Sequence, residues 1–350
     1  MSMKNLCFHI GYSVLGGVDY GSEISLINLC RELSKFYNIV VFSLNLPEKE
    51  KIIDGFLVHR NAVFFEEYIK NNVVDFLVIS RYLNPFLYHD LSHHNVKKII
   101  LWSHDVGFQS AFEGKQMRDM GKHFLKNIED KISTIVCLTD FHADFMKRYY
   151  ETKISFKTIG HGVNEMNDNS INKVKHRFIY TSYPNRGLDL LLKIFPLIRQ
   201  EFPDSELHIY RDESTFSETQ NEVIEMCKDY IKKKGFVDNK EILKAFAEAE
   251  VWLYPTNFAE TYCISALEAQ ANGCLCITSP CGSLNEIIGD RGVLINAEYG
   301  SKEYIERVLK TVRIFFNSTL YENKINRAKS WARSQTYEMI TRKWREEIFD

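Results

Sequence analysis

Several patterns that mark other protein classes are missing from this sequence of 350 residues. No Gly-x-Gly-x-x-Gly follows a strand-like run, which argues against a nicotinamide-dependent dehydrogenase. The spacing of Gly16 and Gly21 is that of a P-loop, but Ser22 stands where a P-loop requires lysine. None of the eight cysteines forms Cys-x-x-Cys. We therefore expect buried, reduced thiols and no zinc ribbon or dithiol redox site.

Long apolar runs and an excess of one charge are also missing. No stretch approaches the roughly 18 apolar residues of a membrane span, and the N-terminal residues lack the pattern of a signal peptide. The 44 basic and 46 acidic residues give a net charge of −2, with no basic excess for nucleic acid. We expect a cytoplasmic protein without a nucleic-acid partner. The basic stretch 147–150 favours a solvated helix face and leaves a peripheral contact with anionic lipid as the alternative.

What the sequence does contain is an alternation of short Val/Ile/Leu-rich runs with longer amphipathic stretches. This alternation predicts doubly wound α/β domains with parallel sheets covered on both faces. A polar segment near residues 164–176 predicts a linker, so we expect one domain over residues 1–165, a second over 166–330 and a helix over 331–350. The expected strands are 5–10, 38–44, 76–80, 97–103, 134–139, 177–181, 206–210, 251–255 and 274–279. The expected helices are 22–36, 64–71, 188–202, 218–233, 242–249, 261–272, 304–316 and 321 to the end.

Two glutamates form the strongest local signal. Glu260 follows a predicted strand at the edge where open α/β sheets bind ligands, and Glu268 lies in the helix that comes next. At about 1.5 Å per residue they are roughly 12 Å apart along the helix axis, too far to share a proton. They suit two hydroxyl-bearing ends of one long ligand. The alternative is a helix-start glutamate favoured by the helix dipole, followed by a surface glutamate.

Arg186 lies in a turn before a predicted helix, where the helix dipole disfavours a cation. A bound phosphate would remove this conflict, because guanidinium and helix N–H groups bind anions together. An exposed arginine is the alternative. Gly16 and Gly17 form a strand-to-helix turn that suits either a ligand or a plain connection, and Gly282 begins a similar turn.

Histidines supply one further candidate. His104 ends a strand-like run, where a ligand contact and a structural role are both open. His89, His93 and His94 have no cysteine or acidic cluster beside them, so we interpret them as surface residues and expect no metal site. The sequence also contains no Asp-x-Asp, the metal-chelating motif of another large class of sugar transferases.

Taken together, these motifs resemble family-four retaining glycosyltransferases of the GT-B fold, also called glycosyl transferases group 1. Glu260 and Glu268 resemble that family's Glu-x7-Glu motif, and 282–286 resembles its Gly-x-x-x-Glu turn. Arg186 stands in a segment similar to the family's phosphate-binding basic turn. The resemblance implies two Rossmann-like domains that face a cleft, with the C-terminal helix crossing back to the N-terminal domain.

The resemblance also implies roles. Glu268 would hold the ribose, Glu260 would contact the donor sugar, and Arg186 would neutralise the diphosphate that leaves. His104 matches a histidine that faces the sugar. The other donor-binding positions implied are Gly16, Gly17, Val237, Tyr262, Cys263, Ile264 and Gly282. The implied reaction moves a hexosyl or pentosyl group from a UDP- or GDP-linked sugar to a glycan, lipid-linked or protein-linked acceptor, with retention and without a further cofactor.

Two positions depart from the family pattern. Cys263 replaces a usual glycine, and Tyr180 stands where a second basic residue is common. Two other functions stay open on these residues: a nucleotide-sugar epimerase of the same fold, and a non-catalytic nucleotide-sugar-binding protein.

The missing Asp-x-Asp generates a prediction about metal dependence. Because fixed cations and helix N-termini would match the charge of the leaving group, we expect sugar transfer to keep most of its rate in EDTA. Initial rates with and without the chelator measure this. A loss of activity that magnesium restores would contradict the prediction.

Overall fold

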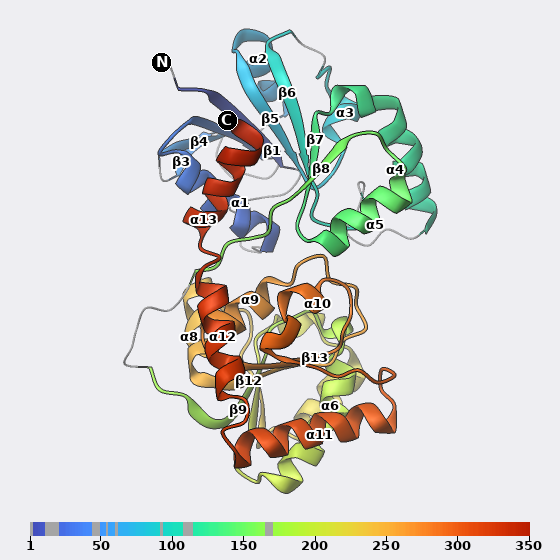
Figure 1. Cartoon of the computed structure of the whole chain (residues 1–350), viewed down its shortest axis with the longest axis vertical. Helices are drawn as coiled ribbons and strands as arrows, with labels where there is room; N and C mark the ends of the chain where they lie inside the picture. The colour runs from blue at the N-terminus through green and yellow to red at the C-terminus, as the bar shows by residue number, and fades with distance from the viewer. Residues whose placement is uncertain are drawn as a thin grey trace. The chain divides into compact units, whose positions relative to one another are not determined.

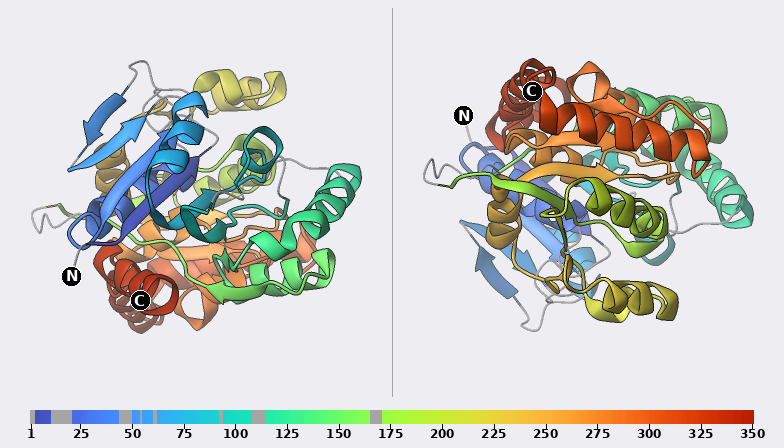
Figure 2. Two further views of the ribbon diagram at one scale, coloured as in Figure 1. Left: turned by 90° about the horizontal axis from the view of Figure 1, so that it is seen from above. Right: turned by 90° about the horizontal axis from the view of Figure 1, so that it is seen from below.

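The computed structural model of the chain describes residues 3–10, 21–43, 50–53, 55–59, 62–91, 94–107, 115–164 and 171–350. The chain divides into two compact units (Figure 1). The N-terminal unit combines Met1–Gly162 with Tyr337–Asp350, and the C-terminal unit spans Val163–Thr336. Each unit is a sheet flanked by helices (Figures 1 and 2).

The sheet of the N-terminal unit has the strand order β3-β4-β2-β1-β5-β6-β7-β8 within the described ranges. All neighbouring strands are parallel except β3 and β4, which form an antiparallel edge. The strands are β1 (Asn5–Ile10), β2 (Asn38–Ser43), β3 (Glu50–Ile53), β4 (Phe56–His59), β5 (Val74–Ser80), β6 (Val96–Trp102), β7 (Thr134–Cys137) and β8 (Ser155–Thr158).

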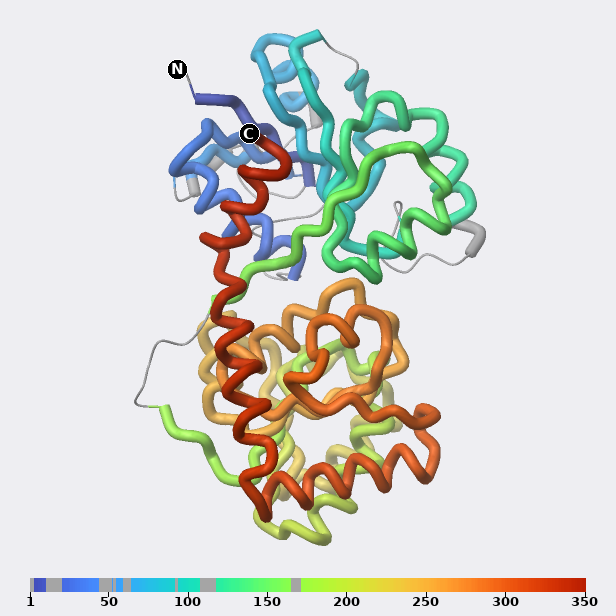
Figure 3. Tube along the Cα trace, in the orientation of Figure 1, coloured from blue at the N-terminus to red at the C-terminus, as the bar shows by residue number. Residues whose placement is uncertain are grey.

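The helices of the N-terminal unit come from residues 21–150 and from the C-terminal segment of the chain. They are α1 (Gly21–Leu33), α2 (Ala62–Asn71), α3 (Pro85–Tyr88), α4 (Lys115–Ile128), the 3₁₀ turn Glu129–Lys131, α5 (Asp140–Tyr150), α13 (Tyr337–Trp344) and the π-helical turn Arg345–Phe349. The last turn of the chain ends beside the first strand (Figure 3), where Lys4 Nζ donates to the carbonyl oxygen of Phe349 at 2.6 Å. The C-terminal segment is therefore an integral part of the N-terminal unit.

The sheet of the C-terminal unit is parallel throughout, with the order β11-β10-β9-β12-β13-β14 among the residues that the structure describes. Its strands are β9 (Val174–Tyr180), β10 (Glu206–Ile209), β11 (Ile231–Lys233), β12 (Ala249–Tyr254), β13 (Leu275–Thr278) and β14 (Val293–Leu294). Nearly all central residues of β12 and β13 are buried, as expected for strands covered on both faces.

The helices of the C-terminal unit pack in pairs, with α11 against α6 and α12 against α9. They are α6 (Leu188–Glu201), α7 (Glu218–Met226), α8 (Asn239–Glu248), α9 (Ile264–Ala271), α10 (Leu284–Ile287), α11 (Lys302–Asn317) and α12 (Glu322–Arg333). Short 3₁₀ turns lie at Pro184–Arg186, Glu213–Thr215 and Gly289–Arg291. No helix within the described ranges has the length and apolar composition needed to cross a membrane.

Lys173 ties the ends of two of these helices together. Its Nζ donates to the carbonyl oxygens of Phe246, Ala249 and Asn272 at 3.0, 2.6 and 2.8 Å. These carbonyls lie at the C-terminal ends of α8 and α9, where a cation is favoured by the helix dipole. The lysine thereby anchors α9, the helix that carries Glu268.

The structure confirms the predicted fold class and corrects two helices. The helix expected over 218–233 ends at Met226, because Ile231–Lys233 adds a strand beside β10. This edge strand has only three residues and no periodicity of its own. The helix expected from residue 321 to the end is interrupted between Arg333 and Tyr337, where Val163 pairs with Thr336. Pairing between distant segments, which periodicity does not encode, decides both cases.

Candidate active site

A tight turn at the carboxyl end of β9 presents Arg186. Pro184 begins a 3₁₀ turn, and Gly187 then takes a left-handed φ of 108° before α6 starts. A Cβ at Gly187 would lie 1.8 Å from the carbonyl oxygen of Pro255, so only glycine fits between this turn and the end of β12. The close approach brings Arg186 to the loop that carries Glu260.

Glu260 is buried in that loop, and its carboxylate accepts hydrogen bonds from two side chains. Arg186 Nη1 lies 3.1 Å from Glu260 Oε1 and 3.3 Å from Oε2. The hydroxyl of Tyr254, the last residue of β12, donates to Oε1 at 2.7 Å. Gly282, with φ of 58°, lies so close to the Glu260 backbone that a Cβ would approach its carbonyl oxygen to 2.6 Å. The predicted site residues Arg186, Glu260 and Gly282 are thus neighbours.

Aromatic rings enclose the guanidinium of Arg186. It lies 4.0 Å from the Phe258 ring centroid and 6.0 Å from that of Tyr183. Burial alone would lower the pKa of Arg186, but the Glu260 carboxylate outweighs it and the pKa is raised. The Nε atom is buried and has no hydrogen-bond partner among the described residues. A buried donor without a partner is uncommon in folded proteins, and an anionic ligand is one explanation of it.

Tyr180 does not take part in this charge cluster. Its side chain is buried in the core, and its hydroxyl donates to the carbonyl oxygen of Tyr183 at 2.7 Å. Burial raises the pKa of Tyr180 well above its usual value, so the phenol stays neutral. Tyr180 therefore stabilises the Arg186 turn through this hydrogen bond to the Tyr183 backbone. A second cation, Arg211, stacks on Tyr183 beside the turn, with its guanidinium 3.7 Å from the centre of the Tyr183 ring.

Glu268 lies in the second turn of α9 and faces a different partner. The side-chain amide of Asn239, at the start of α8, donates weakly to Glu268 Oε1 at 3.4 Å. Burial raises the pKa of Glu268 to about 7, and this hydrogen bond partly opposes the rise. Val237, a predicted donor-binding position, is half-buried two residues before Asn239. The start of α8 therefore places Asn239 beside Glu268, and Val237 lies in the loop just before it.

The start of α9 has an unusual backbone at Cys263. Its φ of 72° and ψ of 79° are left-handed, a conformation that glycine adopts far more readily than cysteine. Tyr262 before it is buried, and Ile264 after it is the first residue of the helix. Burial raises the pKa of the Cys263 thiol well above its usual value. The chain thus keeps the backbone course of a glycine here and adds a neutral side chain.

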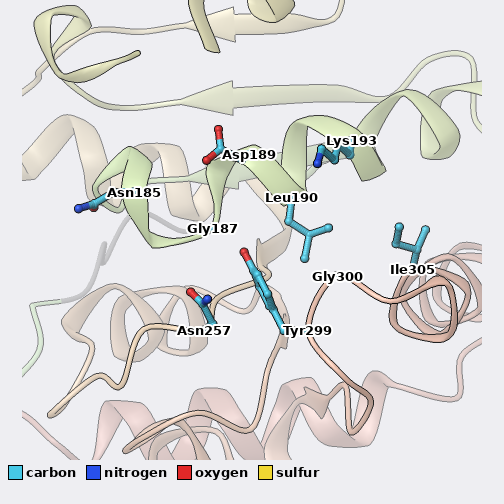
Figure 4. A pocket seen from close by; sticks show the side chains of 9 residues that line it. All are labelled: Asn185, Gly187, Asp189, Leu190, Lys193, Asn257, Tyr299, Gly300 and Ile305. Atoms are coloured by element: carbon cyan, nitrogen blue, oxygen red, sulfur yellow. The ribbon is translucent and has the colours of Figure 1, made fainter. Parts of the chain in front are cut away.

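A cavity of about 360 Å³ adjoins the Arg186 turn. In Figure 4 the Tyr299 ring and the Leu190 side chain lie between α6 and the loop at Gly300. The lining residues are Asn185, Gly187, Asp189, Leu190, Lys193, Asn257, Tyr299, Gly300 and Ile305. The cavity therefore borders both the turn of Arg186 and the loop that leads to Glu260.

In the N-terminal unit, His104 belongs to a buried group of neutral imidazoles. Its Nε2 lies 3.1 Å from Ser80 Oγ, and its ring stacks on His161 with centroids 5.4 Å apart. Burial, reinforced by the neighbouring His161, lowers the pKa of His104 well below its usual value. His161 in turn has its Nδ1 2.5 Å from Ser25 Oγ. At neutral pH these rings can exchange hydrogen bonds with hydroxyl groups but carry no charge.

A charged network lies beside these rings. Arg81, with a left-handed φ of 79°, donates through Nε to Asp105 Oδ2 at 2.6 Å, and its Nη1 lies 3.6 Å from Glu23 Oε1. Burial raises the pKa of Glu23. Strained backbone conformations concentrate at functional sites. The network and His104 both lie at the carboxyl edge of the sheet, the edge where open α/β sheets bind ligands.

Some of the sequence-based candidates fall elsewhere. Gly16, Gly17 and His93 lie outside the described residues. His94 is exposed as expected, but the surface interpretation of His89 is wrong, because its side chain is only 7% exposed and packs 5.1 Å from the Phe65 ring. Among the described residues no group of histidine, cysteine, aspartate and glutamate side chains has the arrangement of a metal site.

Two parallel-sheet units with flanking helices define the GT-B architecture, and comparison with solved structures agrees. Over 98% of both chains, the protein superposes on the pneumococcal O-GlcNAc transferase GtfA in complex with UDP and GlcNAc, with a TM-score of 0.76 and 12% sequence identity. Sucrose-phosphate synthase of Thermosynechococcus elongatus superposes with a TM-score of 0.79 and 13% sequence identity, again over 98% of both chains. HepE of Anabaena in complex with UDP and glucose superposes with a TM-score of 0.73 and 12% sequence identity over 99% of both chains. At such low identities the likeness shows the fold.

Sequence comparison adds information on the C-terminal unit. Residues 175–313 match the family model described as Glycosyl transferases group 1. A curated relative, an uncharacterized 41.2 kDa protein in the cps region of Klebsiella pneumoniae, is 28% identical over 145 residues. That match spans 40% of this chain and 38% of the relative. The match to the group 1 family model thus lies in the C-terminal unit, which holds Arg186, Glu260 and Glu268.

Three candidate site residues gave no signal in the sequence. Tyr254 and Asn239 contact Glu260 and Glu268, and Arg81 joins Glu23 and Asp105. Each reaches its partner across a break between elements, and none forms a motif with that partner. Arg81 and Tyr254 each lie at the end of a strand-like run, so their positions at the carboxyl edge could be inferred, but their partners could not.

The backbone at Cys263 generates a prediction about stability. Cys263→Val should lower the free energy of unfolding by on the order of 1–3 kcal/mol, since a β-branched residue is strained in the left-handed region. Cys263→Gly should stay within about 1 kcal/mol of the natural protein, because relief of strain is offset by greater freedom of the unfolded chain. Urea unfolding of the two variants measures both effects. Equal stability of the valine and glycine variants would contradict the strained backbone.

The raised pKa of Glu268 generates a prediction about pH. If the ionised carboxylate accepts hydrogen bonds from a ribose, donor affinity should fall as pH drops through 7. Between pH 8 and pH 6 the loss should approach about tenfold, the limit for one group that binds only when ionised. Calorimetric titration with a sugar-linked nucleotide measures it, and Glu268→Gln is the control that removes this titration. The same slope in Glu268→Gln would assign the effect to another group.

Proposed function

We propose that this protein is a glycosyltransferase that moves a hexosyl or pentosyl group from a nucleotide-diphosphate sugar to an acceptor hydroxyl, with retention of anomeric configuration. The observation that carries the proposal is the pairing of Arg186 with Glu260 at the carboxyl edge of the parallel sheet. One cation for phosphate and one carboxylate for sugar hydroxyls meet there. Glu268 supplies a second carboxylate from α9, the helix that follows the Glu260 loop.

The donor would bind along the carboxyl edge of the C-terminal unit. The base would contact the loop at Val237, the ribose would give its hydroxyl hydrogens to Glu268, and the sugar would meet Glu260. Arg186 would take the diphosphate, and the N–H groups at the start of α9 would support the same charge. Departure of the nucleoside diphosphate leaves negative charge on phosphate oxygen. Fixed donors in a water-poor site stabilise such charge without reorganisation.

The N-terminal unit would supply the face for the sugar and acceptor. His104 is neutral, so it would donate or accept a hydrogen bond with a sugar hydroxyl and would not act as a fixed cation. In the proposed retaining reaction the departing phosphate takes the acceptor proton, so no side chain must act as the base. The acceptor class proposed is a glycan, a lipid-linked or a protein-linked hydroxyl, with peripheral contact to a membrane as part of that proposal.

No further cofactor is part of the proposal. Arg186 and the N–H groups of α9 carry out the charge neutralisation that a divalent cation would otherwise provide. GtfA and HepE were solved with UDP, so a uridine-linked donor is the first candidate, with guanosine as the second. Synthesis of a glycan or glycoconjugate is the proposed biological setting.

The experiment that tests this function starts from nucleotide binding. A thermal-shift screen with UDP, GDP, ADP and their sugar conjugates should single out one base, because a ligand of the folded state alone raises the unfolding temperature. The selected conjugate should then release nucleoside diphosphate slowly with water as a poor acceptor. Arg186→Ala should lower that turnover by about a hundredfold or more, the range typical for loss of a group that stabilises transition-state charge.

Arg211→Ala provides a matched control, because it removes a neighbouring cation that stacks on Tyr183. This variant should keep turnover close to that of the natural protein. A change of the sugar without release of nucleoside diphosphate would favour the epimerase. Binding without either reaction would favour a non-catalytic protein, and unchanged turnover in Arg186→Ala would move the phosphate site elsewhere.

A further inference from the structure

The two groups with the most direct proposed roles are bound to each other. Arg186 Nη1 contacts both oxygens of Glu260, at 3.1 and 3.3 Å. The Glu260 side chain is 8% exposed and that of Arg186 is 24% exposed, so water screens the pair only weakly. A phosphate that approaches Arg186 therefore meets a guanidinium that is already neutralised, with a second negative charge beside it.

Tyr254 keeps the carboxylate in this position. Its hydroxyl is fully buried at the end of β12 and donates to Glu260 Oε1 at 2.7 Å. Burial raises the pKa of Tyr254 well above its usual value, so the phenol remains a donor at any ordinary pH. The loop backbone is held as well, because Ser283 N–H donates to the carbonyl oxygen of Glu260 at 2.8 Å. Glu260 is thus fixed against Arg186 from two sides.

A nucleoside diphosphate and its sugar conjugate affect this pair differently. Phosphate competes with Glu260 for the guanidinium and leaves the buried carboxylate with fewer partners, which costs free energy. A sugar brings hydroxyl donors that can replace the lost partner of Glu260. The free nucleoside diphosphate brings none, and it places an additional negative charge close to the carboxylate.

We propose that Glu260 selects the sugar-linked donor over the free nucleoside diphosphate, because it occupies Arg186 whenever no sugar hydroxyl engages it. Tyr254 is the positioning residue that holds the carboxylate in place for this task. The inference rests on the proposed function and adds to it a means of rejecting the product. Transfer removes the sugar, so the Glu260 carboxylate is left beside the diphosphate without a hydroxyl partner, and the nucleoside diphosphate leaves more readily.

Calorimetric titration of the full chain with UDP, GDP or ADP and the matching sugar conjugate tests the proposal. The quantity that matters is the ratio of the two dissociation constants, free nucleotide over conjugate. Glu260→Gln removes the competing charge and keeps a side chain of the same shape. It should bind the free nucleotide about three- to tenfold more tightly, as expected for a close charge contact. The conjugate should bind no more tightly, because the amide replaces a better acceptor of sugar hydroxyls.

Two further variants separate this role from a general effect. Tyr254→Phe should move the ratio in the same direction by a smaller factor, whereas a merely structural role would weaken both ligands alike. Glu225→Gln removes a negative charge from the exposed face of α7, where the carboxylate pairs with Lys228 at 2.6 Å and is not part of the candidate site. Its ratio should stay within about twofold of the natural value, since exposed charges are strongly screened.

The outcomes distinguish this inference from the function on which it rests. A natural protein that binds a nucleotide, together with a Glu260→Gln variant whose ratio is unchanged, would overturn the inference and leave the proposed function standing. An equal shift in Glu225→Gln would also overturn it, because the effect would then be that of net charge. A natural protein that binds none of the nucleotides would overturn both.

Discussion

A buried charge must be matched, and in the C-terminal unit this requirement organises the whole site. Neither Arg186 nor Glu260 would be stable in its surroundings alone, because each has lost most of its water. The pairing needs the Arg186 turn to touch the end of β12 and the Glu260 loop to touch the turn at Gly282. Only glycine at positions 187 and 282 allows these approaches. The backbone of three loops is thus shaped around one ion pair.

The two units place different kinds of polar side chain at the carboxyl edge of their sheets. In both, polar side chains collect at the carboxyl edge of a parallel sheet, where strands end and helices have not yet begun. The C-terminal unit places fixed charges there, as a diphosphate and hydroxyl groups would require. The N-terminal unit places His104 and His161 there, with pKa values lowered by burial, next to the paired charges of Arg81 and Asp105. Uncharged rings suit hydroxyl groups that must be oriented without being ionised.

Much of the fold was readable from the sequence, because strands covered on both faces are nearly continuous apolar runs. The first strand, Asn5–Ile10, was predicted to the residue, and the ends of β2, β5 and β6 differ from prediction by two residues or fewer. Two of the differences from the prediction share one cause. The edge strand Ile231–Lys233 and the break at Ser334–Thr336 exist because a distant segment pairs with them, and neither has a periodicity that would announce it.

For the site, the sequence by itself determined which residue types lie at which edge: Arg186 before a helix, Glu260 after a strand, Glu268 further along the next helix, and His104 at a strand end. These positions follow from the order of elements along the chain. Only the tertiary structure decided that Arg186 binds Glu260, that Tyr254 and Asn239 hold the two glutamates, and that Cys263 keeps the backbone of a glycine. Such contacts depend on side-chain reach and loop conformation across separate elements, which local sequence patterns do not encode.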